Sequence, residues 1–137
     1  DAEAIANSIE GWRIPTKKEW QTLIAYTGGN EKTKNFLEKK GDQGFNLEYS
    51  GYYSIGTSKN NYKDEFRYIG NYVAFWAYSD YRDSWNKDAT IIEFSNKPSF
   101  GNYIDFRRKH VRQFAYSVRL LKDIDYELDP NLVPLLK

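Results

Sequence analysis

One run, from Gly11 to Trp20, constrains the fold of this chain more than any other stretch. Thr16 is followed three residues later by Glu19, which is the spacing of a helix capping box. The Thr16 hydroxyl can accept from the backbone N–H of Glu19, and the Glu19 carboxylate can reach back to the N–H of Thr16. Pro15 disfavours helix at Ile14, so the chain is extended up to Thr16. The run therefore predicts an extended entry followed at once by a helix.

The predicted helix covers about Thr16–Tyr26 and is ended by Gly28 and Gly29. One face of it collects residues at three- and four-residue spacing: Trp20, Leu23, Ile24 and Thr27. Because tryptophans lie on both sides of Pro15, we expect Trp12 and Trp20 to be buried at a corner on which later strands pack.

Two further helices are expected. Asp1–Ile9 places alanines and isoleucines on one face and acidic residues in its first turn. A weaker helix is expected over Glu31–Lys40, with Phe36 and Leu37 as the residues that it buries. The N-terminal part of the chain is thus predicted to be helical.

From Gly44 onward the hydrophobic period changes to two, which indicates strands. Tyr68–Ser79 is apolar on both faces, as in a central strand covered on both sides. Ala89–Ser95 and Gln113–Leu121 also alternate. Irregular connections are expected at Gly51–Lys63, Asp80–Lys87 and Asn96–Asn102. Helices followed by strands predict an α+β fold, with two to three helices packed on a twisted antiparallel sheet with long loops.

Length and composition restrict the number of domains and the classes of partner and site that this chain can have. The 137 residues suit one domain, and a net charge of +1 gives no reason to expect nucleic acid as a partner. No apolar run is long enough to span a bilayer. Cysteine is absent, which excludes disulfides and a thiol nucleophile. Methionine is absent too, so we expect a processed or trimmed chain.

The order of these landmarks resembles a known family. Gly11-Trp12-Arg13-Ile14-Pro15-Thr16 with Glu19-Trp20 is similar to the signature of the Fibrobacter succinogenes major paralogous domain. Further motifs follow in the family's order: Gly28-Gly29, Gly44-Phe45, Gly51-Tyr52-Tyr53, Phe75-Trp76-Ala77-Tyr78-Ser79-Asp80, and Tyr116-Ser117-Val118-Arg119 with Lys122-Asp123. The resemblance covers about residues 1–123 and leaves 124–137 as a tail.

The resemblance implies a C-type lectin-like fold and an exported, outer-membrane or lipoprotein location in Bacteroidetes-like bacteria, and it implies no activity. Two family cysteine positions are Ser8 and Leu120 here, which fits the loss of a disulfide. The fold that the resemblance implies usually has a strand before the first helix, whereas the expected helix Asp1–Ile9 opens the given sequence. We therefore expect part of Ile124–Leu136, or another chain, to occupy the vacant sheet edge.

The loop Asp80–Asp88 is the most suggestive site of the sequence. Its oxygen ligands, at Asp80, Asp83, Asn86 and Asp88, are of the type that Ca²⁺ prefers. Arg82 and Lys87 would neutralise much of that charge, so Asx turns and surface ion pairs are favoured and no metal is assigned.

Aromatic and basic residues complete the candidate ligand-binding set. Aromatic residues make up 18% of the chain, and tyrosine and tryptophan suit sugar and protein recognition. The run Arg107–Arg112 holds the single histidine, His110, beside cations with no adjacent acid to orient it, so it favours a solvated basic hairpin over catalysis. An anionic ligand there is the alternative. The candidate ligand-binding residues are Tyr78, Asp80, Tyr81, Asp83, Trp85, Asn86, Asp88, Arg107 and Arg108.

The function expected from the sequence is non-catalytic recognition. The chain would be an exported module that binds a glycan or a surface protein through the loops Gly51–Lys63, Asp80–Asp88 and Asn96–Arg108, without a cofactor. The alternative is a structural or accessory subunit of an envelope complex that docks through its apolar tail. An enzyme ranks third.

Overall fold

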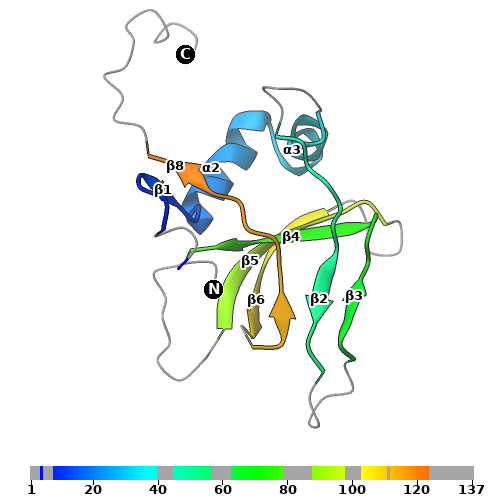
Figure 1. Ribbon diagram of the computed structural model, residues 1–137. Coiled ribbons are helices and arrows are strands. Elements are labelled where there is room, and N and C mark those ends of the chain that lie inside the picture. The colour runs from blue at the N-terminus through cyan, green and yellow to red at the C-terminus, as the bar shows by residue number, and fades with distance from the viewer. Residues whose placement is uncertain are drawn as a thin grey trace, which may run out of the picture.

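Two helices lie against one face of a three-stranded antiparallel sheet, and a smaller sheet extends away from them (Figure 1). The computed structural model describes residues 4, 8–39, 45–56, 63–78, 88–97, 103–110 and 112–123. The described elements are β1 Trp12–Arg13, α2 Lys17–Thr27, α3 Asn30–Leu37, β2 Tyr52–Ser54, β3 Glu65–Arg67, β4 Tyr72–Ala77, β5 Asp88–Ser95, β6 Tyr103–His110, β7 Phe114–Ala115 and β8 Leu121–Lys122.

The capping box at the start of α2 is present as predicted. Thr16 Oγ1 accepts from the Glu19 backbone N–H at 3.1 Å, and Glu19 Oε2 accepts from the Thr16 N–H at 2.8 Å. At the other end, Gly28 takes a left-handed conformation with φ of 90°, which a side chain would resist. The predicted helix is therefore confirmed, with its last residue at Thr27.

Arg13 ties the start of the chain to its end. Its guanidinium donates to both carboxylate oxygens of Glu19 and, through Nε, to both oxygens of Asp123. β1 pairs antiparallel with β8, so Trp12 lies opposite Lys122. The hydrogen bond from Arg13, opposed in part by burial, lowers the pKa of Glu19 to about 2. Arg13 thus links the carboxylate that caps α2 to Asp123, next to the β1–β8 pair.

β4 is covered on both sides, as its two apolar faces predict, although it is an end strand in the order β4-β5-β6. It pairs with β5 along its whole length, and β5 pairs with β6. Its other edge bonds to three separate segments: Gly51 N–H donates to the Tyr72 carbonyl, Ser117 exchanges bonds with Ala74 and Trp76, and Tyr78 N–H donates to the Pro15 carbonyl.

Two cores lie on the two faces of this sheet. The larger core joins Trp20 of α2 and Leu37 of α3 to the face that carries Phe75 and Phe94. Trp20 is 3% exposed, and its ring stacks on Phe75 with 5.9 Å between centroids. The second core centres on Tyr72, Ala74, Ile91 and Tyr116, and Tyr52 of the small sheet packs against it.

Two expectations about buried residues are wrong. Trp12 is 38% exposed, because the two-residue β1 lies at the margin of the fold and Ile14 and Pro15 are buried in its place. Phe36 is 43% exposed, and α3 buries Thr33 beside Leu37. Thr33 is tolerated there because its hydroxyl donates to the Gly29 carbonyl at 2.8 Å.

Several strand bounds also differ from those predicted. The segment from Tyr68 to Asn71 is a turn before β4, because Tyr68 and Gly70 have φ values of 59° and 82°. The expected strand Gln113–Leu121 is divided into β7, an isolated bridge at Ser117 and β8.

The loops expected at Gly51–Lys63 and Asn96–Arg108 contain β2 and most of β6, so neither is wholly irregular. The tail Ile124–Leu136 and most of the expected helix Asp1–Ile9 lie outside the described residues.

Candidate functional site

The predicted ligand-binding residues are only partly described. Asp80, Tyr81, Asp83, Trp85 and Asn86 lie outside the described residues, and Asp88 is the first residue of β5. Tyr78 is partly exposed directly after β4, where its backbone bridges to Thr16. The loop prediction therefore stays a prediction.

The two arginines of the predicted set are strand residues. Arg107 and Arg108 are neighbours in β6, so their side chains point to opposite faces of the sheet. Arg107 forms ion pairs with the buried Glu93 and with Asp105, the latter at 3.4 Å. The Tyr72 hydroxyl donates to the other oxygen of Glu93 at 2.7 Å. Arg107 thus contributes to the fold as well as to the surface.

The structure reveals a different candidate site on the small sheet, which has the strand order β3-β2-β7. A groove of about 510 Å³ follows β2. We call it the aromatic groove. It is lined by Ser50, Gly51, Tyr52, Tyr53, Phe66, Ala115, Tyr116 and Ser117.

The wall of the aromatic groove is a row of cross-strand neighbours. Tyr53 of β2 lies opposite Phe66 of β3 on one side and Ala115 of β7 on the other. Residues in such register share one face of a sheet. The Tyr53 and Phe66 rings meet edge to face with 5.0 Å between centroids, and Phe66 is 67% exposed. Since Ala115 carries only a methyl group, the other flank of the Tyr53 ring is left open.

Small and polar residues line the rest of the groove. Ser50 and Ser117 are joined through their hydroxyl oxygens at 3.0 Å, so two hydroxyls from distant segments meet there. Gly51 has φ of +72°, and a Cβ at this position would lie 2.3 Å from the Arg67 carbonyl oxygen. Glycine therefore allows β2 to approach the segment after β3.

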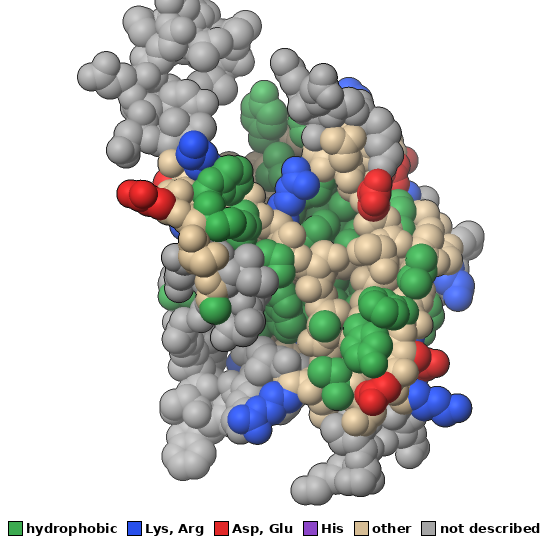
Figure 2. Space-filling model, in the orientation of Figure 1, with side chains coloured by type: hydrophobic (Ala, Val, Ile, Leu, Met, Phe, Trp, Pro, Cys, Tyr) green, Lys and Arg blue, Asp and Glu red, His purple; other side chains and the backbone are tan. Residues whose placement is uncertain are grey.

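The reverse face of β2 fixes the groove on the body of the protein. Tyr52 points away from Tyr53 and contacts four aromatic rings with centroid distances of 5.5–5.8 Å. The rings belong to Tyr68, Tyr72, Phe114 and Tyr116. Such packing makes the small sheet a rigid support for exposed side chains. Figure 2 shows hydrophobic side chains gathered over β2 and β3.

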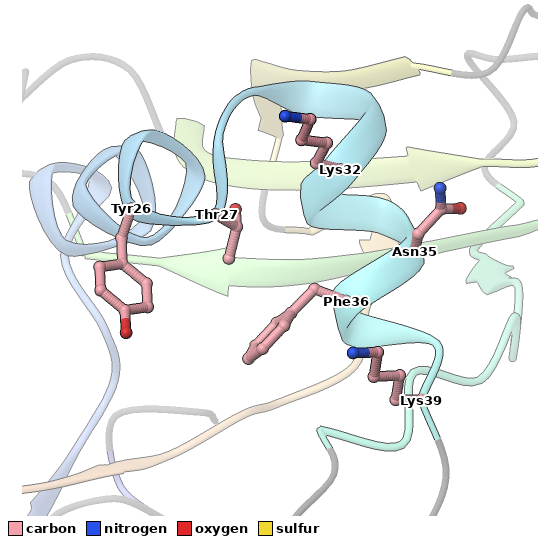
Figure 3. A pocket seen from close by; sticks show the side chains of 6 residues that line it. All are labelled: Tyr26, Thr27, Lys32, Asn35, Phe36 and Lys39. Atoms are coloured by element: carbon pink, nitrogen blue, oxygen red, sulfur yellow. The ribbon is translucent and has the colours of Figure 1, made fainter. Parts of the chain in front are cut away.

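A second hollow of about 520 Å³ lies between the helices (Figure 3). We call it the interhelical pocket. It is lined by Tyr26, Thr27, Lys32, Asn35, Phe36 and Lys39. Tyr26 and Phe36 extend to the same side of the gap, and the Lys39 amine lies 5.7 Å from the centre of the Phe36 ring.

The described side chains that line the aromatic groove supply ring faces and hydroxyls, and none of them is a carboxylate or an imidazole. Among the described residues, no group of three or more histidine, cysteine or acidic side chains is arranged to hold a metal ion. The calcium alternative concerned a loop that is mostly outside those residues.

Sequence reasoning missed the groove because its lining residues come from three segments, 50–53, 66 and 115–117, that meet only in three dimensions. The pair Tyr52-Tyr53 was a usable signal, since adjacent tyrosines in a strand must face opposite sides. One tyrosine of such a pair is then available for the core and the other for the surface.

Comparison with known proteins gives one result. The sequence model of a family described as the Fibrobacter succinogenes major domain matches residues 6–122. Searches of curated proteins and of solved structures found no match. Within the described part of the chain, no helix is both long and apolar enough to cross a membrane.

Proposed function

This chain belongs to the Fibrobacter succinogenes major domain family, and we propose that it is a non-catalytic recognition module that binds a glycan through the aromatic groove. The single observation that carries the proposal is the row Phe66–Tyr53–Ala115 on the open face of the small sheet. An aromatic wall beside a small residue leaves room for a flat, ring-shaped ligand.

A sugar ring suits this surface better than a purely apolar ligand. One side of many pyranose rings is a patch of C–H groups that packs on an aromatic face, while its hydroxyls need hydrogen-bond partners. Tyr53 and Phe66 offer the rings, and Ser50 and Ser117 offer hydroxyls. The volume of about 510 Å³ is in the range of small-ligand sites.

Location and fold are part of the same proposal. We propose that the chain is exported and acts at the bacterial cell surface, and that its α+β architecture is of the C-type lectin-like kind. Support for the fold comes from the helices packed on an antiparallel sheet and from the β1–β8 pairing of segments near both ends of the family match.

Protein recognition is the second candidate. The observation that favours it is the edge strand β3, whose Phe66 is 67% exposed and whose outer edge has no strand partner among the described residues. An envelope-complex subunit that docks through its tail stays a prediction, since 124–137 lies outside the described residues.

A glycan array tests the proposal. The purified chain would be applied with calcium and with a chelator, beside an Ala115→Leu variant whose longer side chain fills the open flank of Tyr53. We expect related glycans to be retained by the unaltered chain in both buffers and lost by the variant. Retention by both proteins alike would overturn the groove assignment, and capture of no glycan would overturn the function.

A further inference from the structure

The interhelical pocket is lined by two lysines. Within the described part of the chain, the ammonium groups of Lys32 and Lys39 have no carboxylate within ion-pair distance, whereas Lys34 on the same helix pairs with Glu38 at 3.7 Å. Glu38 also accepts from the Tyr49 hydroxyl at 2.5 Å, so that carboxylate is engaged away from the pocket. The described residues that line the pocket therefore include two lysines and no acidic side chain.

The same pocket offers ring faces and neutral hydrogen-bonding groups. Tyr26 is 72% exposed on α2 and Phe36 is 43% exposed on α3, so two aromatic side chains on neighbouring helices present ring surface to solvent. Thr27 and Asn35 add a hydroxyl and an amide to the lining. The lining combines a platform for a ring with donors for a negative charge.

We infer that the interhelical pocket binds an anionic sugar residue, with the ring packed on Phe36 or Tyr26 and the carboxylate or sulfate held by Lys39, whose amine lies beside the Phe36 ring. Lys32, at the other end of α3, adds positive charge to the same pocket. The inference deepens the proposed glycan recognition by adding a second subsite with charge selectivity. A volume of about 520 Å³ matches a small ligand. An acidic peptide segment would need a larger contact area than six residues provide.

The charge requirement makes a defined prediction about variants. Lys32→Gln and Lys39→Gln each remove the charge and shorten the side chain by one atom. We expect Lys39→Gln to weaken binding of an acidic sugar by about threefold to tenfold, and Lys32→Gln, at the more distant amine, to weaken it by less. Lys18→Gln is the matched control, because Lys18 is an exposed lysine on α2 outside the pocket.

NMR titration of the whole chain tests the inference. Galacturonate, glucose 6-sulfate, neutral galactose and acetate would be titrated separately, with the amide signals of Thr27 and Asn35 reporting on the pocket and those of Tyr53 and Ser117 on the aromatic groove. We expect the two acidic sugars to shift the pocket signals saturably, more weakly at high salt and in both lysine variants. The sulfate and carboxylate arms distinguish the two anions.

Each other outcome is decisive. Equal shifts with neutral galactose would overturn the charge selectivity, and equal shifts with acetate would overturn the sugar. Unchanged pocket signals with both acidic sugars would overturn the inference as a whole. Failure of the proposed function would be seen separately: no neutral glycan would shift the amide signals of Tyr53 and Ser117 in the aromatic groove.

Discussion

Arg13 and Glu19 are joined side by side, with Nη1 donating to Oε2 at 2.7 Å and Nη2 donating to Oε1 at 2.5 Å. The same carboxylate caps α2 through the backbone N–H of Thr16. Arg13 also reaches Asp123, next to β8. The guanidinium of Arg13 therefore links the start of α2 to the β1–β8 pair, whose two strands are distant in sequence.

Two substitutions of Glu19 distinguish the contribution of the helix cap to stability from that of the ion pair with Arg13. Glu19→Gln keeps one oxygen that can accept from Thr16, but it loses the charge and the second acceptor for Arg13. We expect a loss of about 0.5–1 kcal/mol, since the pair is about one-third exposed. Glu19→Ala removes both contributions and is expected to cost about 1–2 kcal/mol. Urea unfolding measures both, with Lys18→Ala as the control on the same helix. Equal losses for the two Glu19 variants would contradict the separation.

The lowered pKa of Glu19 predicts a stability profile at acid pH. The pKa falls from an ordinary value of 4.5 to about 2 in the folded protein, so the contribution is complete above pH 4.5. It is lost as the pH falls from there toward 2, because the unfolded chain takes up the proton first. The free energy of unfolding should drop less steeply in Glu19→Gln over this window. If the free energy of unfolding fell equally steeply with pH in both proteins, the protonation of Glu19 would not be the cause of the loss.

Tyr72→Phe tests the buried polar network beneath the small sheet. The hydroxyl of Tyr72 donates to Glu93, which is 3% exposed. Removing it leaves a buried carboxylate oxygen short of a donor, so we expect a loss of about 1–3 kcal/mol in the free energy of unfolding. Tyr26→Phe, at an exposed tyrosine, should change stability by less than about 0.5 kcal/mol. Similar values for the two variants would disprove the role of the network.

Gly51→Ala tests how the aromatic groove is built. Gly51 and Gly70 both have positive φ, but only at Gly51 would an added Cβ meet the backbone, 2.3 Å from the Arg67 carbonyl oxygen. We expect about 1–2 kcal/mol of destabilisation for Gly70→Ala and about 2–4 kcal/mol for Gly51→Ala. Thermal and chemical unfolding compare the two directly. A Gly51→Ala cost no greater than that of Gly70→Ala would refute the close approach of β2.

Local sequence signals predicted the parts of the fold that depend on neighbouring residues. The spacing of Thr16 and Glu19 located α2, and the two apolar faces of Tyr68–Ser79 indicated a strand covered on both sides, which is Tyr72–Ala77 in the structure. β6 was missed because Arg107 and its basic neighbours resemble a solvated loop, although charged residues are also typical of an edge strand.

Features that depend on distant partners were beyond such signals. The exposure of Trp12 follows from the two-residue pairing of β1 with β8, which no local pattern encodes. The aromatic groove likewise requires the register of Tyr53 with both Phe66 and Ala115, which are 13 and 62 positions away in the chain. The tyrosine content favoured an exposed aromatic surface somewhere on the fold. Its position on the small sheet follows from the strand register.

The central claim is that Tyr53, Phe66 and the open flank above Ala115 form the glycan-binding surface. The most direct measurement is calorimetric titration of a glycan captured on the array into the unaltered chain and into Tyr53→Ala, Phe66→Ala, Ala115→Leu and Tyr78→Ala. We predict that the first three variants weaken binding by at least about tenfold, while Tyr78→Ala, near the predicted loop site, stays within about twofold. Unchanged affinity in the three groove variants, or a loss confined to Tyr78→Ala, would contradict the claim.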